Sequence, residues 1–351
     1  MASFPPPLLW LKKPGENFVF LYREKDEQPD VQAPTDSVIQ LHPFQCTARN
    51  PPLSFLSPYP QKIYIPDLSE MITAQHLPWM EYLRSTNTPT TTREDHIQLI
   101  KNFQKEMTHN GLIKAIASRA KKIPMPAHFH PAHFFRAMCE CYEDAYVYLL
   151  AHPEAGLWTG SSPELLLKQK SNEIETLSLA GTLPNVEAAS FGIKEWEEQQ
   201  IVTDSILQIL AEYRIQTEKP GPPQVKKLNH ISHLYTPLFG KITGTTMKAS
   251  MLAAALHPTP AVGGFPKEKA IRAINQYENY DRAYYTGYTG ITDPYGSLFF
   301  VNLRCMQVTP HHILLYAGGG ITLRSLPEKE WEETEWKMQT LEQLLVRLYP
   351  P

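Results

Sequence analysis

The chain has little of what secreted, membrane or nucleic-acid-binding proteins usually show. Its four cysteines, Cys46, Cys139, Cys141 and Cys305, include no Cys-x-x-Cys pair, so a disulfide frame or a zinc site is not expected. No apolar run reaches the roughly 18 residues of a membrane span. The net charge is −3 without a basic run, which argues against nucleic-acid binding. The first seven residues lack the charged and apolar parts of a signal peptide, so a cytoplasmic protein is expected.

The composition is that of a globular protein with a sizeable core. Apolar residues make up 42% of the chain and charged residues 20%, and 351 residues allow one large domain or two ordinary ones. Proline is frequent, with 32 residues, where an average chain has ~5%. Many of these prolines lie among the first 90 residues, so this part is expected to be rich in loops.

Hydrophobic periodicity predicts helices and strands in groups. Helices are expected at residues 75–86, 94–109, 188–214, 247–256, 266–279 and 327–348. Strands are expected at 17–22, 37–42, 144–151, 163–169, 173–180, 233–243, 283–291, 297–308 and 312–317, with a turn at 160–163, and 112–118 suits either state. Runs of adjacent strands with interspersed long helices predict an α+β fold with largely antiparallel sheets.

Two stretches of the chain have similar acidic residues. Lys194–Glu198 and Glu330–Thr334 each contain a Glu-x-x-Glu spacing, and each lies in a predicted helix. Residues three apart share one helix face, so each stretch offers two carboxylates to one side. Two such faces around one point would suit Mg²⁺, which takes few protein carboxylates and keeps water and substrate oxygens. Two solvated amphipathic helices would have the same spacing, so the spacing alone leaves both interpretations open.

A loop rich in proline and glycine, LHPTPAVGGFP at Leu256–Pro266, carries the most specific signal. It resembles the His-Pro-Thr-Pro-Ala loop of isochorismate synthases, within the chorismate-utilising family that includes anthranilate and salicylate synthases. Further segments resemble family motifs in the same order, from about residue 100 to 348. They are Lys114–Arg119, Gly160–Leu166, Leu179–Thr182, Lys194–Glu198, Leu303–Arg304, Tyr316–Ile321 and Glu330–Thr334 with Lys337. So many ordered motifs make the resemblance specific.

The resemblance implies a reaction in which water attacks C2 of chorismate while the C4 hydroxyl leaves and the double bonds shift. It implies Lys114 as the base that takes the proton of the water and Glu164 as the acid that protonates the leaving hydroxyl. Lysine is protonated in water, so apolar surroundings would have to favour its neutral amine. Burial would raise the pKa of Glu164 and keep its proton in place near neutral pH.

The resemblance also implies a Mg²⁺ cofactor. Glu198 and Glu333 are its expected direct ligands. Glu195 and Glu330, one turn earlier, are expected to hold metal-bound waters as outer ligands. A divalent cation would turn the repulsion between these glutamates and the ring carboxylate of chorismate into attraction.

The expected substrate contacts come from side chains and from glycine backbone. Arg304 suits the enolpyruvyl carboxylate because its guanidinium fork matches a carboxylate. The backbone at Gly318 and Gly320 can approach a ligand closely, and Gly181 and Thr182 are expected to bind the ring carboxylate. The remaining expected contacts are His257 and Ala261 in the loop, Tyr285 on the ring, and Lys337, which would balance charge near the metal.

Among family members, the loop favours an enzyme that uses water and stops at isochorismate. An aminodeoxychorismate-type enzyme would be expected to have a lysine nucleophile here, and Ala261 cannot serve as one. A salicylate synthase, or an ammonia-using enzyme of the anthranilate synthase type, is the alternative. A catalytically silent binding protein with this fold is disfavoured because Lys114, Glu164, Glu198 and Glu333 are all present.

The sequence therefore predicts a monomeric, cytoplasmic, Mg²⁺-dependent isochorismate synthase that feeds menaquinone or siderophore biosynthesis. Chorismate is the expected substrate, and no obligatory protein partner is expected. One chorismate-binding domain is expected over residues 1–351, with an abbreviated part at 1–90 and a catalytic core at 91–351. Two stacked subdomains should enclose the site in a cleft lined by the strand run 283–317 and the helices 188–214 and 327–348.

Overall fold

Two large β-sheets form the centre of the computed structural model, which describes residues 6–24, 37–57, 60–74, 79–185, 191–228, 231–243 and 247–350. In the first sheet the strands follow the order β14 (Gly264–Phe265), β6 (Lys114–Pro124), β18 (His312–Ile321), β17 (Cys305–Val308), β8 (Gly156–Ser162), β7 (Tyr146–His152), β1 (Leu8–Lys12), β2 (Phe18–Arg23) and β5 (Gln61–Tyr64). We call it sheet A.

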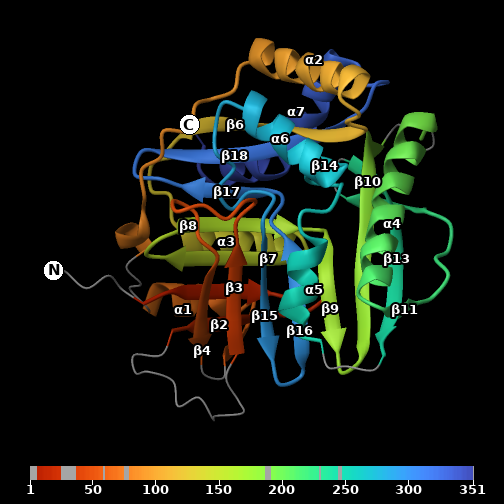
Figure 1. Ribbon diagram of the computed structural model, residues 1–351. Helices are drawn as coiled ribbons and strands as arrows, with labels where there is room; N and C mark the ends of the chain where they lie inside the picture. Colours follow the sequence, from red (N-terminus) through yellow and green to blue (C-terminus); the bar gives the residue numbers. More distant parts are fainter. Residues whose placement is uncertain are drawn as a thin grey trace.

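The second sheet, sheet B, also has nine strands. Their order is β11 (Ile215–Thr217), β13 (Ile231–Ile242), β10 (Glu173–Pro184), β9 (Leu165–Lys170), β16 (Gly296–Val301), β15 (Tyr288–Asp293), β3 (Ser37–His42) and β4 (Leu53–Ser57), and β12 (Gln224–Leu228) pairs with β13. Within the described residues the neighbouring strands of both sheets pair antiparallel, as with β6 and β18 or β10 and β13. In Figure 1, β6, β8, β17 and β18 lie across the view, and β9, β15 and β16 run down it.

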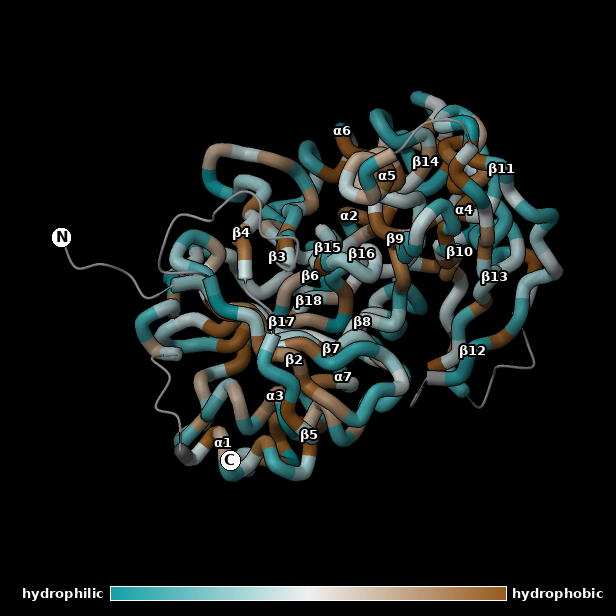
Figure 2. Tube along the Cα trace, turned by 90° about the horizontal axis from the view of Figure 1, so that it is seen from below, coloured by the Kyte–Doolittle hydropathy of each residue, from teal (hydrophilic) through white to brown (hydrophobic). Residues whose placement is uncertain are grey.

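Helices cover the outer faces of the two sheets. The helices are α1 (Leu68–Ala74), α2 (Arg93–His109), α3 (Pro131–Cys141), α4 (Ile193–Glu212), α5 (Ala249–Leu256), α6 (Lys267–Tyr277) and α7 (Pro327–Leu348), with a short 3-10 helix, η1 (Trp79–Tyr82). α3 and α7 pack on sheet A, whereas α4 and α5 pack on β10 and β9 of sheet B. Figure 2 shows hydrophobic stretches of β9, β10 and α4 gathered on the side of the molecule away from α1 and β5.

The strands of sheet A explain this layering, because both of their faces are apolar. All seven residues of β7 are buried. Tyr146, Tyr148 and Leu150 join the core between the two sheets, while Val147 and Leu149 join the core under α3 and α7. Successive side chains of a strand point to opposite faces, so a strand that is buried at every position requires cover on both sides.

Most predicted elements are found within a few residues of their expected bounds, and the expected α+β fold with antiparallel sheets is confirmed. The segment that suited either state is strand β6. The proline-rich N-terminal part contributes β1, β2 and β5 to sheet A and β3 and β4 to sheet B, so it completes both sheets. Within the described residues, no helix combines the length and the apolar character that a membrane crossing needs.

The prediction for residues 283–317 was wrong in one respect that matters for the site. The expected strand 283–291 begins only at Tyr288, and the expected strand 297–308 breaks at residues 302–304 into β16 and β17, which belong to different sheets. At the break, the side-chain amide of Asn302 donates from Nδ2 to Tyr284 O at 2.8 Å, and Arg304 has a φ of 44°. This crossing between the sheets places Arg304 and Tyr285 beside a pocket.

Two smaller predictions also differ from the structure. The expected turn at 160–163 is mostly strand, because residues 160–162 end β8. In the expected helix 75–86, residues 75–78 lie outside the described residues, and only η1 is helical in the remainder. The start of the expected helix 188–214 also lies outside them up to residue 190, and α4 begins at Ile193.

Candidate active site

One pocket, with about 720 Å³ of empty space, lies where sheets A and B meet. Its lining comes from β6, β10, β13 and β18, from α4 and α7, and from four loops. The lining residues are Lys114, Ile116, Pro163, Glu164, Leu179, Ala180, Gly181, Thr182, Glu198, His233, Ala261, Val262, Tyr285, Thr286, Leu303, Arg304, Tyr316, Ala317, Gly318, Gly320, Glu333 and Lys337. Twelve of the fifteen predicted site residues are therefore in one place.

Lys114, the predicted base, is the first residue of β6 and is fully buried. Its Nζ lies 2.9 Å from Glu198 Oε1 on α4. The missing side chain of Gly320 makes this pair possible. A Cβ at Gly320 would lie 1.5 Å from Glu198 Oε1 and 3.1 Å from Lys114 Cε. Any side chain at residue 320 would therefore separate the lysine from the glutamate.

Glu164, the predicted acid, lies in the short connection between β8 and β9 and is 2% exposed. Its backbone is held on both sides, since Glu164 N donates to Ser162 Oγ at 3.3 Å and Glu164 O accepts from Val301 N at 3.1 Å. Burial raises the pKa of Glu164 from 4.5 to about 8, although Lys114 and Lys337 act in the opposite direction. The side chain thus keeps its proton at neutral pH, as an acid must.

Three carboxylates and three lysines meet beside Gly319 and Gly320. Glu198, Glu330 and Glu333 are all buried. The three ion pairs are Lys114–Glu198 at 2.9 Å, Lys194–Glu330 at 2.6 Å and Lys337–Glu333 at 2.7 Å. In the part of the chain that the structure describes, no three His, Cys, Asp or Glu side chains are already grouped as a metal site. Each carboxylate is instead paired with its own lysine.

The same residues are compatible with a hard divalent cation. Glu330 Oε2 is buried without a hydrogen-bond partner among the described residues, and it would lie 3.2 Å from a Cβ at Gly319, with Glu333 Oε1 at 3.5 Å. Burial and the charge of Glu333 raise the pKa of Glu330 to about 7, even though Lys194 lowers it. Carboxylate oxygens that repel one another, one of them unpaired, are the donors that Mg²⁺ prefers. Glu198, Glu330 and Glu333 could hold such an ion.

Glu195 does not share this arrangement. Its Oε2 accepts from Gly192 N at 2.8 Å, just before α4 begins, so its carboxylate serves the end of its own helix. Its backbone packs against the site, because a Cβ at Gly181 would lie 3.0 Å from Glu195 Cβ and 3.3 Å from Glu195 O. The helix terminus thus occupies one carboxylate oxygen of the expected outer ligand on α4, and its role at a metal stays a prediction.

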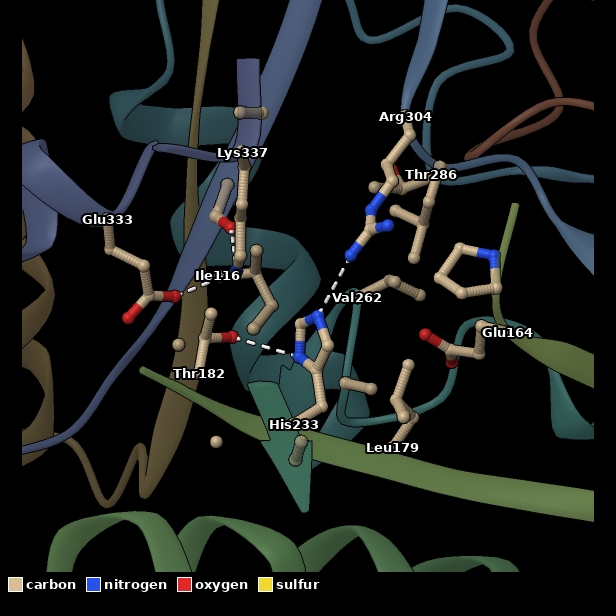
Figure 3. Close-up of a pocket in the computed structure, with 18 of the residues that line it drawn as sticks. Ile116, Glu164, Leu179, Thr182, His233, Val262, Thr286, Arg304, Glu333 and Lys337 are labelled. Carbon is tan, nitrogen blue, oxygen red and sulfur yellow. Dashed lines mark hydrogen bonds and ion pairs between the residues drawn. The ribbon is translucent and has the colours of Figure 1, made fainter. Parts of the chain in front are cut away.

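A hydrogen-bonded chain, Arg304–His233–Thr182, crosses the wall of the pocket (Figure 3). The guanidinium Nη2 of Arg304 donates to His233 Nε2 at 3.1 Å, and His233 Nδ1 lies 3.1 Å from Thr182 Oγ1. Burial, and after it the positive charge of Arg304, lowers the pKa of His233 well below 6.5, so the ring is neutral. Because Nε2 accepts, we assign the proton to Nδ1, which donates to Thr182. The threonine hydroxyl can then donate its own proton into the pocket.

His233 is the site residue that the sequence reasoning missed. It is 7% exposed on β13, and a single histidine in a strand carries no spacing signal. A second feature was also missed: the buried ion pair Arg282–Glu278, in which Arg282 donates to Val262 O at 2.9 Å and to Ile116 O at 2.7 Å. These bonds fix two residues of the pocket wall from behind.

The other predicted contacts divide into two groups. Tyr285 lies in the turn before β15 and comes close to Gly318, whose Cβ would lie 3.2 Å from Tyr285 Oη. Lys337 donates to Gly318 O at 2.8 Å. His257 is absent from the described lining of the pocket. It is buried behind the loop, with Nε2 3.2 Å from both Pro43 O and Phe44 O, and it holds the loop that carries Ala261. His257 is thus placed to support the loop, and its expected contact with substrate stays a prediction.

Comparisons with known proteins identify the family. The family described as "Chorismate binding enzyme" matches residues 67–346, so the chain belongs to the chorismate-binding enzymes. It is 32% identical over 259 residues to the vibriobactin-specific isochorismate synthase of Vibrio cholerae, covering 71% of this chain and 66% of the relative. It is 31% identical over 278 residues to isochorismate synthase MenF of Escherichia coli, covering 73% and 63%. The alignments thus span about two thirds of these relatives' own length.

The fold is also that of a solved member. A structure described as a putative 2,3-dihydroxybenzoate-specific isochorismate synthase, DhbC, from Bacillus anthracis superposes with a TM-score of 0.81. The superposition covers 98% of this chain and 97% of that chain at 23% sequence identity. At this identity the likeness shows the shared fold alone.

Proposed function

We propose that this chorismate-binding enzyme is a Mg²⁺-dependent isochorismate synthase. The observation that carries the proposal is the pairing of two buried groups in one pocket. Lys114 lies 2.9 Å from the carboxylate of Glu198, which can balance the positive charge that the lysine acquires when it takes a proton, and Glu164 keeps its proton at neutral pH because burial raises its pKa to about 8. Two relatives named isochorismate synthase share about a third of their aligned residues with this chain, which supports the same activity.

The reaction needs one proton removed and one proton supplied. Lys114, as the amine, takes a proton from the water that attacks C2. Glu164 gives its proton to the C4 hydroxyl, which leaves as water while the double bonds shift. Each step separately is general acid–base catalysis, which contributes about 10²–10⁴-fold in rate. The product differs from chorismate only in the position of the hydroxyl group and the double bonds, so atoms and charge balance.

The remaining lining residues bind and orient the substrate. Arg304, held by His233, faces the pocket with a guanidinium fork that suits the enolpyruvyl carboxylate. Thr182 and the backbone beside Gly181 suit the ring carboxylate. A bound Mg²⁺ supplies the positive charge that lets this carboxylate lie near Glu198 and Glu333. Ala261 lines the pocket and brings no nucleophile, which supports water as the attacking group.

The cellular role follows from the relatives in general terms. One relative is named as specific for vibriobactin, and the solved structure of MenF from Escherichia coli is described as menaquinone-specific. We therefore propose that the product feeds siderophore or menaquinone biosynthesis. The four cysteines are free, as is usual for a protein of the cytoplasm. We propose one chorismate-binding domain that works there without an obligatory protein partner.

Product identification tests the proposal. Purified protein is incubated with chorismate and Mg²⁺, with and without ammonium, and the products are separated and weighed by mass spectrometry. Isochorismate as the product in both conditions, lost when a chelator is added, is the expected result. Salicylate with pyruvate, or anthranilate with ammonium, would contradict the assignment while keeping the family. Lack of any product from the folded protein would contradict enzymatic activity altogether.

A further inference from the structure

Lys194 is a charged residue near the carboxylates for which neither substrate binding nor proton transfer provides a role. It is the second residue of α4, and its Nζ lies 2.6 Å from Glu330 Oε1 on α7. The described lining of the pocket includes Lys114 and Lys337 but leaves out Lys194. The side chain of Lys194 is 20% exposed, and that of Glu330 is 3% exposed. The lysine therefore reaches a buried carboxylate from outside the pocket.

The ion pair between Lys194 and Glu330 lies among further charged side chains. Lys194 Nζ contacts Glu330 directly, and Glu198 lies one helical turn further along α4. The ammonium thus places a positive charge beside a group of three buried carboxylates. Glu330 has one oxygen on Lys194 and one buried oxygen without a partner among the described residues. A metal cation bound to this second oxygen would share the Glu330 carboxylate with Lys194, and the two positive charges would repel each other.

We propose that Lys194 is a built-in counter-ion of Glu330 that lowers the affinity of the substrate-free enzyme for its divalent cation and stabilises the metal-free protein. The lysine and the metal ion compete for the negative charge of the same carboxylate. This inference rests on the proposed Mg²⁺ requirement. It makes Lys194 a positioning residue that sets how tightly the metal is held, without contact to substrate.

The chain offers a matched control for this proposal. Arg324, just before α7, forms a second ion pair with α4 through Glu197, with Nε–Oε2 at 3.3 Å. Both partners are about half exposed or more, so this pair joins the same two segments in water and leaves the three carboxylates untouched. Exposed pairs of this kind contribute little to stability. Arg324→Met therefore removes an ion pair between α4 and the segment that leads into α7, without changing the charge at Glu330.

The test compares Mg²⁺ binding and thermal stability in the absence of substrate at pH 8. Isothermal calorimetry on Lys194→Met should show Mg²⁺ bound about tenfold more tightly than in the wild type, the size typical of outer-shell changes. Its metal-free Tm should fall by on the order of 5 °C, because a buried carboxylate loses its partner, and Mg²⁺ should restore most of that loss. Lys194→Arg and Arg324→Met should both behave as the wild type.

The outcomes separate the inference from the proposed function. Unchanged or weaker Mg²⁺ binding by folded Lys194→Met would overturn the inference, because the lysine would then only hold Glu330 in place. If Lys194→Met does not fold, Lys194→Gln gives the same comparison with a polar side chain. If the wild type binds Mg²⁺ neither alone nor with chorismate, the metal requirement of the proposed function fails as well.

Discussion

The two glutamate patches look alike in sequence and differ in space. On α7, Glu330 and Glu333 are both buried, and both carboxylates lie beside the backbone of Gly319. On α4, Glu198 lies beside the backbone of Gly320, whereas Glu195 accepts a hydrogen bond from the backbone at the start of its own helix. Lys194 then takes the place opposite Glu330. The same Glu-x-x-Glu spacing thus gives two site carboxylates on one helix and one on the other.

The reason for the difference is the position of each patch relative to the start of its helix. Glu195 is the third residue of α4, after Gly192 as the N-cap, and a glutamate at this position can accept from the N-cap amide. Glu330 is the fourth residue of α7, after Leu326 as the N-cap, and its own N–H already donates to Leu326 O at 3.1 Å. One residue of offset decides whether a carboxylate is used by the helix or by the site.

The largest expected effect comes from the lysine that pairs with the site carboxylate of α4. Lys114→Met should lower kcat by about 10³–10⁴-fold, because the water then lacks its base. Chorismate binding, measured by calorimetry with the folded variant, should remain. Turnover close to the wild-type rate would remove Lys114 from the mechanism.

Glu164, across the pocket from the two helices, should show the next largest effect. Its pKa of about 8 is raised by burial from 4.5, so the acid form prevails below pH 8 and is lost above it. The rate should therefore fall about tenfold per pH unit above pH 8. Glu164→Gln should lose about 10²–10³-fold in kcat and lack this decline in its pH profile. A decline that persists in Glu164→Gln would assign it to another group.

A third prediction sharpens the contrast between the helices. Glu333→Gln should raise the Mg²⁺ concentration that gives half-maximal rate by about 10–100-fold, because a predicted direct ligand loses its charge. The measurement is a Mg²⁺ titration of the rate at saturating chorismate. An unchanged titration would mean that the buried face of α7 does not hold the metal.

The smallest effect on the Mg²⁺ titration is expected from a substitution at Glu195. A large effect would contradict the difference between α4 and α7. Glu195→Gln should leave the Mg²⁺ titration unchanged, since its carboxylate binds the backbone at the start of its own helix. The glutamine keeps an oxygen that accepts from Gly192 N–H but lacks the negative charge near the helix N-terminus. This loss should cost about 0.3–1 kcal/mol of folding stability, or a fall in Tm of about 1–2 °C, visible by calorimetry. A shift in the Mg²⁺ titration similar to that of Glu333→Gln would restore the symmetry that the sequence suggests.

Much of the fold could be predicted because its signals are local. The apolar run of β7, the alternating polar and apolar residues of β10 and the long helices α4 and α7 were recognisable from periodicity. The break at Asn302–Arg304 was not, because it depends on a contact between Asn302 and Tyr284, distant in sequence, and on a left-handed backbone at Arg304. Periodicity does not report such tertiary contacts.

The candidate site was predictable wherever a family motif named a residue type. Twelve predicted residues share the pocket. Glu195, Glu330 and His257 lie outside the described lining, since a motif does not say which side of a helix or loop a side chain occupies. His233 was missed, and Lys194 was given no role, because each contacts a partner, Arg304 or Glu330, that lies far away in the sequence.

The attack of water at C2 is the central claim, and an isotope label tests it most directly. Chorismate is converted by the protein with Mg²⁺ in water enriched in oxygen-18, and the product is analysed by mass spectrometry after limited conversion. The account predicts isochorismate that carries one oxygen-18 atom at C2. Isochorismate without the label, or a product other than isochorismate, would contradict it.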